Sequence, residues 1–187
     1  MAGNALKAVT SSETNEWYTP AWVMEIARAG LGVRDIRLDP ASCELANKTV
    51  QADQFFTKED DGLSKNWDAY SVFMNPPYGG KVGPFLRKLV SELDADRVNC
   101  AAVLVNALPG RKWFQENIWE HADVVFFFNK RIKFVDAEGV VQDKPTQDNV
   151  MAFYGVHTEA TISVLRSQYG DLGTVIRCSD VMRGRKK

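Results

Sequence analysis

The stretch YSVFMNPPYGG, which spans residues 70–80, determines the fold class that we predict for this chain of 187 residues. Residues Tyr70 to Met74 are mostly aromatic, apolar or β-branched, which is typical of a buried strand. This strand must end at Asn75-Pro76-Pro77, because proline cannot donate a hydrogen bond to a neighbouring strand. Apolar residues then recur at helical spacing between Phe85 and Leu93. A buried strand, a rigid turn and an amphipathic helix in this order predict an α/β fold.

The same alternation of strands and helices continues on both sides of this stretch. On the N-terminal side, the spacing predicts a helix with Thr19 as its cap and Pro20 as its first residue, followed by a short strand at Ile36 to Leu38. Further strands are predicted at residues 100–105, 124–128, 150–154 and 174–178, and further helices at residues 44–50, 112–119 and 159–169. Such alternation predicts a mostly parallel sheet with helices on both faces.

The predicted domain organisation is a single core. We expect a flexible N-terminal segment over residues 1–15, one domain over residues 16–180 with a hairpin inserted near residues 130–142, and a basic tail over residues 181–187. Hydrophobic residues make up 45% of the chain and charged residues 25%, which excludes a disordered or coiled-coil chain as a whole.

The charge balance excludes a protein that condenses nucleic acid by bulk positive charge. Lysine and arginine number 23 against 24 for aspartate and glutamate, so the formal net charge is -1. Any nucleic-acid surface must therefore be local. If DNA binds near Asn75, basic side chains should gather on that side of the sheet, and the candidates are Lys81, Arg111, Lys112, Arg131 and Lys133.

Cysteine usage and hydropathy predict a cytoplasmic protein. Cys43, Cys100 and Cys178 lack the spacing of a zinc site, so we expect reduced thiols and no metal. No apolar run approaches the roughly 20 residues that cross a bilayer, and the N-terminus lacks the apolar stretch of a signal peptide. We expect no membrane contact and favour a monomer.

The tetrapeptide Asn75-Pro76-Pro77-Tyr78 has the groups needed to methylate a poorly nucleophilic amine. The lone pair of an aromatic or amide nitrogen is conjugated, so an enzyme must accept both hydrogens and leave the lone pair facing an electrophile. The Asn75 side-chain carbonyl and the Pro76 main-chain carbonyl are suitable acceptors, and the prolines hold the latter rigidly. Tyr78 offers a flat face for a planar base. The alternative interpretation is a simple turn after a strand.

Five stretches, in their order and spacing, resemble the phage-type (Dam-like) DNA N6-adenine methyltransferases. The resemblance covers roughly residues 15–154 and is more specific than any one motif. The stretches are Asn15-Glu16-Trp17-Tyr18-Thr19-Pro20, Leu38-Asp39-Pro40-Ala41-Ser42, Asp60-Asp61-Gly62-Leu63 with Trp67, Asn75-Pro76-Pro77-Tyr78-Gly79, and Lys130-Arg131-Ile132-Lys133-Phe134.

The resemblance implies a fold and an activity. The fold is the three-layer, Rossmann-like fold of S-adenosylmethionine-dependent methyltransferases, with a mostly parallel sheet and a late antiparallel strand. The activity is transfer of a methyl group from S-adenosylmethionine to N6 of an adenine flipped out of double-stranded DNA. A phage-encoded enzyme of this kind would act in the cytoplasm of a bacterial host.

The resemblance also assigns roles residue by residue. The residues that would grip the flipped adenine are Asn75, Pro76, Pro77 and Tyr78. Those that would close over the methionine end of the cofactor are Trp17, Tyr18, Thr19 and Pro20, and those of the first cofactor motif are Asp39, Pro40, Ala41 and Ser42. Asp61 would receive the adenine or ribose of the cofactor, with Asp53 as a second candidate. The glycine-rich turn that is usual after the first strand is absent here, where Pro40-Ala41-Ser42-Cys43-Glu44 replaces it.

Several of these residues also have simpler interpretations. Asp39 could cap the following helix, and Trp17 and Tyr18 could be core residues. Arg131 and Lys133 could contact phosphates or lie on a solvated edge, and Phe134 could bracket the extruded base.

Two other functions share the motif. The acceptor could be an RNA adenine or a protein glutamine, whose planar nitrogens need the same two hydrogen-bond acceptors. The chain could also be a DNA-binding module without catalysis.

Overall fold

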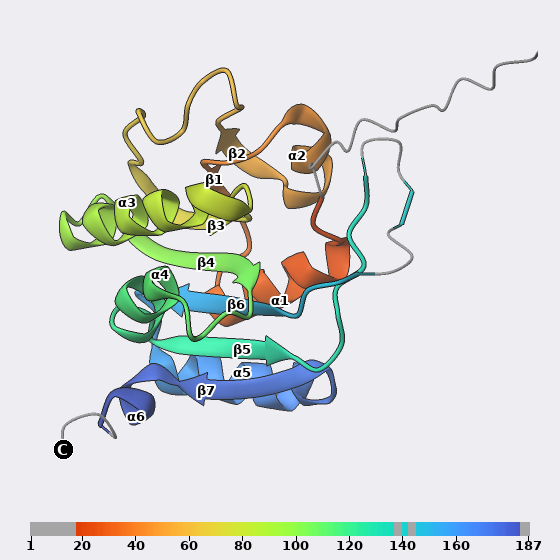
Figure 1. Cartoon of the computed structure of the whole chain (residues 1–187), viewed down its shortest axis with the longest axis vertical. Helices are drawn as coiled ribbons and strands as arrows, with labels where there is room; N and C mark the ends of the chain where they lie inside the picture. Colours follow the sequence, from red (N-terminus) through yellow and green to blue (C-terminus); the bar gives the residue numbers. More distant parts are fainter. Residues whose placement is uncertain (1–17, 137–139, 142–144, 184–187) are drawn as a thin grey trace, which may run out of the picture.

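The computed structural model describes residues 18–136, 140–141 and 145–183, and its centre is a seven-stranded sheet (Figure 1). The strand order is β2-β1-β3-β4-β6-β5-β7. The strands are β1 (Ile36–Asp39), β2 (Ala52–Phe55), β3 (Ala69–Met74), β4 (Val98–Asn106), β5 (Val124–Phe128), β6 (Asn149–Tyr154) and β7 (Gly173–Arg177).

The sheet is mostly parallel, as predicted. Strands β1 to β4 pair in parallel, β6 is antiparallel to both β4 and β5, and β7 is antiparallel to β5. Strands β1 to β5 therefore run in one direction, and both β6 and β7 run against it. The sequence predicted a single late antiparallel strand, because the apolar runs at residues 150–154 and 174–178 do not show which neighbour each strand pairs with.

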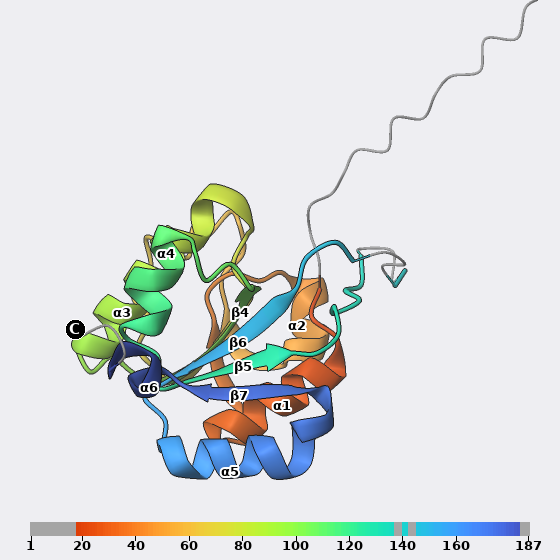
Figure 2. The same ribbon diagram turned by 60° about the horizontal axis from the view of Figure 1, so that its bottom comes forward.

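Helices cover both faces of the sheet and make three layers (Figure 2). One face is covered by α1 (Ala21–Leu31) and α5 (Thr158–Tyr169), and α2 (Glu44–Val50) packs against α1. The other face is covered by α3 (Val82–Asp94), α4 (Lys112–Phe114), the π-helical turn η2 (Gln115–Trp119) and α6 (Cys178–Arg183). Two 3-10 turns, η1 (Gly79–Lys81) and η3 (Gly170–Leu172), complete the secondary structure of the described residues.

Each face of the sheet has its own apolar cluster. Phe73, Phe126 and Phe153 belong to the cluster under α1 and α5, whereas Trp67 and Tyr154 belong to the cluster under α3. These five side chains are fully buried, so aromatic residues form much of the core on both faces of the sheet. The predicted fold class, a three-layer α/β fold with a mostly parallel sheet, is therefore confirmed.

The N-terminal end of α1 differs from the prediction by one residue. Pro20 is the cap and the helix begins at Ala21. Thr19 does not cap the helix, because its hydroxyl accepts a hydrogen bond from the side chain of Asn75.

The insertion after β5 is held by isolated bridges rather than by strands in the described residues. Val135 forms antiparallel bridges with Tyr18 and with Val141. The amide of Asp136 donates to the carbonyl of Val140 over 3.0 Å, so the chain does reverse here. The rest of the predicted hairpin, residues 137–139 and 142, lies outside the described residues.

The ordered C-terminal part extends beyond the predicted domain boundary at residue 180. Helix α6 continues to Arg183, and Val181 and Met182 pack against the apolar cluster under α3. The predicted basic tail therefore begins later than residue 181, and its last part, residues 184–187, lies outside the described residues. No helix among the described residues is both long and apolar enough to cross a membrane.

The carboxyl ends of β1 to β5 meet at one edge of the sheet, where open α/β sheets bind their ligands. The basic residues that the sequence singled out follow the ends of three of these strands. Lys81 follows β3, Arg111 and Lys112 follow β4, and Arg131 and Lys133 follow β5. Acidic residues lie at this edge as well, because Asp39 and Asp61 line the cavity there, Lys112 pairs with Glu116 and Arg131 pairs with Asp148. A gathering of positive charge on the Asn75 side stays a prediction.

Candidate active site

A cavity of about 570 Å³ opens at the carboxyl edge of the sheet. Its walls are the loops that follow β1, β2 and β3, together with the segment before α1. It brings together most of the residues that the sequence predicted for the site, namely Tyr18, Thr19, Asp39, Pro40, Ala41, Ser42, Asp61, Asn75, Pro76, Pro77 and Tyr78.

The amide of Asn75 is held from the side by Thr19. Asn75 follows the last residue of β3, and its Nδ2 donates to Oγ1 of Thr19 over 3.3 Å. Thr19 is only 4% exposed, so this contact is shielded from water. In this arrangement the hydroxyl accepts one amide hydrogen, and Oδ1 of Asn75 lies on the other side of the amide. Two segments that are 56 residues apart in sequence meet at the centre of the motif.

Tyr78 contributes a buried hydroxyl. Burial raises the pKa of Tyr78 above its usual range. Among the described residues, this hydroxyl has no hydrogen-bond partner. A buried polar atom without a partner often marks a place where a ligand completes the hydrogen bonding.

Asp39 lies at the end of β1 as a buried carboxyl group. Its side chain is 2% exposed, and Oδ1 accepts a hydrogen bond from the amide of Ala41 over 3.1 Å. Burial raises the pKa of Asp39 to about 7, against the opposing effect of the Ala41 hydrogen bond. The carboxyl group therefore changes its charge near neutral pH. It does not cap α2, because Cys43 occupies the cap position and its Sγ accepts from the amide of Ala46.

The turn after β1 needs no glycine. The described non-glycine residues with positive φ are Gln51, Asp61 and Asp96, and none of them lies in this turn. The loop after β2 holds the turn in place. Ser42 donates to the carbonyl of Phe56 over 2.9 Å, and Phe56 donates to the carbonyl of Asp39 over 3.0 Å. Residues with ordinary backbone conformations thus form the wall that a glycine-rich turn would form elsewhere.

Asp61 also lines the cavity, from the loop between β2 and β3. Its φ of +52° is unusual for a residue with a side chain. The carbonyl of Asp61 accepts from both the amide and the hydroxyl of Ser64, each over 2.8 Å. The next residue, Gly62, is buried and also lines the cavity.

The structure does not bring Asp53 and Pro20 to the cavity lining. Asp53 is on the edge strand β2, and its carboxylate forms an ion pair with Arg37 of β1. Pro20 is the cap of α1. Trp17 lies outside the described residues.

The residues predicted to contact DNA lie outside the cavity lining. Phe134 is 6% exposed and packs in the cluster under α1. Contact of Phe134 with an extruded base stays a prediction. Arg131 pairs with Asp148 over 3.0 Å and donates to the carbonyl of Pro145, whereas Lys133 is exposed.

The sequence missed several residues of the cavity. Lys58 brings positive charge to it, and Phe73 and Phe85 are apolar parts of its wall. Lys81, which the sequence named only as a candidate for DNA contact, also lines the cavity. A signal existed for Lys81, which lies three residues after Tyr78. Phe73 and Phe85 were predicted as strand and helix core, and nothing in the pattern shows that one edge of each faces a cavity. The described residues contain no group of three His, Cys, Asp or Glu side chains that could hold a metal ion.

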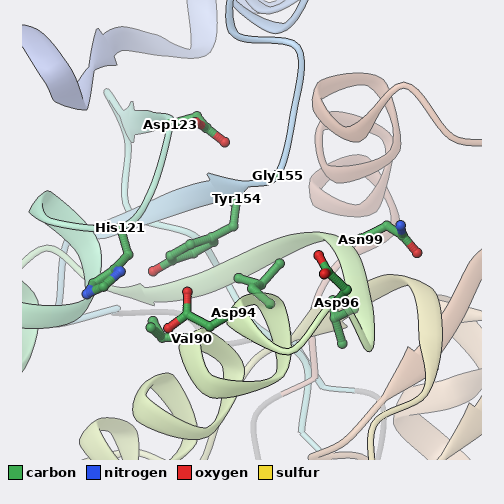
Figure 3. A pocket seen from close by; sticks show the side chains of 10 residues that line it. Val90, Asp94, Asp96, Asn99, His121, Asp123, Tyr154 and Gly155 are labelled. Atoms are coloured by element: carbon green, nitrogen blue, oxygen red, sulfur yellow. The ribbon is translucent and has the colours of Figure 1, made fainter.

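A second cavity, of about 280 Å³, lies at the opposite edge of the sheet (Figure 3). It is lined by the ends of α3 and β6 and the start of β4, and its charged residues are Asp94, Asp96 and Asp123 beside His121. Oδ2 of Asp123 accepts from the amide of Val156 over 3.0 Å. None of the residues assigned from the sequence lines this cavity, so it is separate from the candidate active site.

Comparison with known proteins agrees with the resemblance found in the sequence. A DNA N-6-adenine-methyltransferase of Haemophilus phage HP1 (strain HP1c1) is 26% identical over 162 residues, which covers 86% of this chain and 89% of the phage protein. The crystal structure of a proposed RNA methyltransferase from Pyrococcus horikoshii, 17% identical, matches with a TM-score of 0.47 over 76% of this chain and 86% of that one. The model of the DNA N-6-adenine-methyltransferase (Dam) family matches residues 7–175. Since this match spans most of the chain, the protein belongs to the DNA N-6-adenine-methyltransferase (Dam) family.

Proposed function

We propose that the protein transfers a methyl group from S-adenosylmethionine to N6 of an adenine that is flipped out of double-stranded DNA. The observation that carries this proposal is the single cavity that joins Asn75-Pro76-Pro77-Tyr78 to the loops after β1 and β2. Such a chain would act on DNA in the bacterial cytoplasm, and we expect it to act as a monomer.

The residues of the cavity fit the proposed cofactor. S-adenosylmethionine carries a sulfonium and an ammonium group, which favour carboxylates, and ribose hydroxyls, which donate to them. Asp39 and Asp61 supply these carboxyl groups from two walls of the cavity. Tyr18 and Thr19 would hold the methionine end, and the turn Pro40-Ala41-Ser42 would lie along the rest. When bound, the cofactor supplies an activated methyl group on a positively charged sulfur.

The acceptor would be held by the end of β3. The side-chain oxygen of Asn75 and the main-chain oxygen of Pro76 would accept the two hydrogens of N6, and the ring of Tyr78 would stack on the base. This arrangement turns the nitrogen lone pair toward the methyl group. A strong base is unnecessary, because the amine becomes acidic as the bond to carbon forms, and its proton then leaves to water.

The proposal is tested by methyl transfer from labelled S-adenosylmethionine to unmethylated DNA. Removing the Asn75 acceptor in Asn75→Ala should lower the rate at least about 100-fold, the usual cost of losing one preorganised group in an active site. The matched control is Asn99→Ala, because Asn99 is an exposed asparagine beside the second cavity. Equal rates for Asn75→Ala and the wild type would contradict the role of Asn75.

The nature of the acceptor is tested on the labelled product. Nuclease digestion should release the label from DNA as N6-methyladenine. Release by protease instead would identify a protein glutamine, and label found only in RNA would identify an RNA adenine. A chain without catalysis would give no label in any product, and S-adenosylmethionine would then leave its melting temperature unchanged.

A further inference from the structure

The geometry points to Trp67 as a positioning residue for the cofactor, because its indole N–H holds the loop that carries Asp61 against the loop after β1. In the sequence, Trp67 belongs to the stretch that resembles the Dam-like family. This inference rests on the proposed binding of S-adenosylmethionine in the large cavity. It concerns how that cavity keeps its width.

The hydrogen bond of Trp67 is short and buried. Nε1 of Trp67 donates to the carbonyl of Gly62 over 2.8 Å, and Trp67 is 0% exposed. Gly62 is itself buried and lines the cavity next to Asp61. Losing the donor would leave a buried carbonyl without this partner, and such a group moves toward water where it can.

The backbone of Gly62 is pressed against the first loop of the site. A Cβ built on Gly62 would lie 2.0 Å from the carbonyl oxygen of Pro40 and 3.5 Å from Cβ of Phe56. The two loops therefore touch through main-chain atoms, which only glycine permits at this position. Pro40 begins the turn that we propose for the cofactor, so the position of Gly62 sets the distance between the two walls.

The conformation of Asp61 depends on this support. Its positive φ is unfavourable for a residue with a side chain and persists only where the surroundings hold it. On its exposed side the loop is held by Ser64, and on its buried side by Trp67.

Trp67 is in turn fixed by its own neighbours. Its ring stacks on that of Phe85 with a centroid distance of 6.2 Å, and the ammonium group of Lys88 lies 5.4 Å from its centroid. Phe85 also lines the cavity. A single tryptophan thus connects the wall formed by α3 to the loop that carries Asp61.

The test compares Trp67→Phe with Trp119→Phe. Trp119 is a matched control because it is 6% exposed, belongs to the same apolar cluster and stacks on Phe127 at 6.2 Å, yet is not part of the cavity lining. We expect Trp67→Phe to raise the Kd and KM for S-adenosylmethionine about 5- to 10-fold, the effect of one hydrogen bond. The KM for DNA and the kcat at saturating cofactor should stay within twofold of the wild type. Trp119→Phe should lower the melting temperature without changing the Kd for the cofactor.

A second variant at position 67 tests the hydrogen bond in case Trp67→Phe fails to fold. Benzothienylalanine at position 67 keeps the shape of the ring but replaces its N–H by sulfur, and it should weaken cofactor binding by the same factor. In an Asp61→Ala background, the effect of Trp67→Phe on the Kd should become clearly smaller, because Trp67 acts through the loop of Asp61.

The inference is overturned if both changes at position 67 leave the Kd for the cofactor within twofold of the wild type. It is also overturned if Trp119→Phe raises the Kd for the cofactor as much as Trp67→Phe does. A third contrary result would be a double variant, Trp67→Phe with Asp61→Ala, whose increase in Kd equals the product of the two single increases. If the wild type binds no S-adenosylmethionine, the proposed function itself is rejected, which is a distinct result.

Discussion

At the scale of single residues, the hydroxyl of Thr19 is a buried hydrogen-bond partner of the Asn75 amide. It accepts from Nδ2 over 3.3 Å in a buried position. An amide that loses this partner can turn over and present a donor where the proposed reaction needs an acceptor. We therefore expect Thr19→Val, which keeps the shape and removes the oxygen, to lower kcat about 10-fold. Single-turnover rates with labelled cofactor measure this effect.

The conservative variant separates this role from simple packing. Thr19→Ser keeps the hydroxyl and loses a methyl group, so it should retain a rate within about threefold of the wild type. If Thr19→Ser were as slow as Thr19→Val, packing rather than the hydrogen bond would be the function of Thr19.

The buried carboxyl group of Asp39 should make the free energy of unfolding depend on pH. Its pKa is raised to about 7 by burial, so between its ordinary pKa and pH 7 the folded protein binds a proton that the unfolded chain has released. The contribution of Asp39 to the free energy of unfolding must therefore fall as pH rises through this window. Replacing it by Asn removes this dependence, because the amide does not ionise.

The pH dependence of Asp39 is measured by urea unfolding at pH 5 and pH 8. Asp39→Asn should be more stable relative to the wild type at pH 8 than at pH 5, by roughly 1–4 kcal/mol. Asp123, whose pKa is also raised by burial, titrates in both proteins and cancels in the comparison. An equal difference at the two pH values would show that Asp39 is already ionised at pH 5.

At the scale of elements, the local sequence pattern was enough to predict the limits of a strand or helix where its apolar residues follow a clear period. The predicted limits of α2 and β5 agree with the structure, because Cys43 and Asp123 precede clear runs of helical and strand pattern. The order of motifs along the chain also located the cavity, since parallel strands bring their carboxyl ends to one edge.

Predictions failed where long-range pairing decides the outcome. Asp53 and Asp61 are both acidic residues near β2, but the register of β1 with β2 places Asp53 beside Arg37, away from the cavity. No local pattern contains that register. The hydrogen bond of Trp67 is also absent from any local pattern. Its indole N–H meets the carbonyl of Gly62, five residues earlier in the sequence, only when the loop between them is folded.

The burial of Phe134 had a signal in the sequence. Exposed and buried residues alternate here: Arg131 and Lys133 are exposed, and Ile132 and Phe134 are buried. This alternation with a period of two indicates an extended segment with one face in the core. The neighbouring cations favoured a contact with DNA, but the period already favoured burial of the ring.

At the scale of the whole molecule, exposed basic residues and acidic residues occur at both edges of the sheet. The acidic residues Asp94, Asp96 and Asp123 line the cavity at the edge opposite to Asn75. Arg111 and Lys133 follow strand ends at the edge that carries the candidate active site, and both are exposed. With a net charge of -1, attraction for DNA has to come from local groups of exposed cations such as these.

The exposed cations at the Asn75 edge predict how DNA binding depends on salt. Each phosphate contact that is removed should make the slope of log K against log salt less steep by about 1. We expect this change for Arg111→Ala and for Lys133→Ala, measured by fluorescence anisotropy with duplex DNA. Arg34→Ala is the matched control, because Arg34 is exposed just before β1, at the opposite edge. Equal slopes for Arg111→Ala, Lys133→Ala and the wild type, or an equal change in Arg34→Ala, would mean that DNA does not dock on the edge around Asn75.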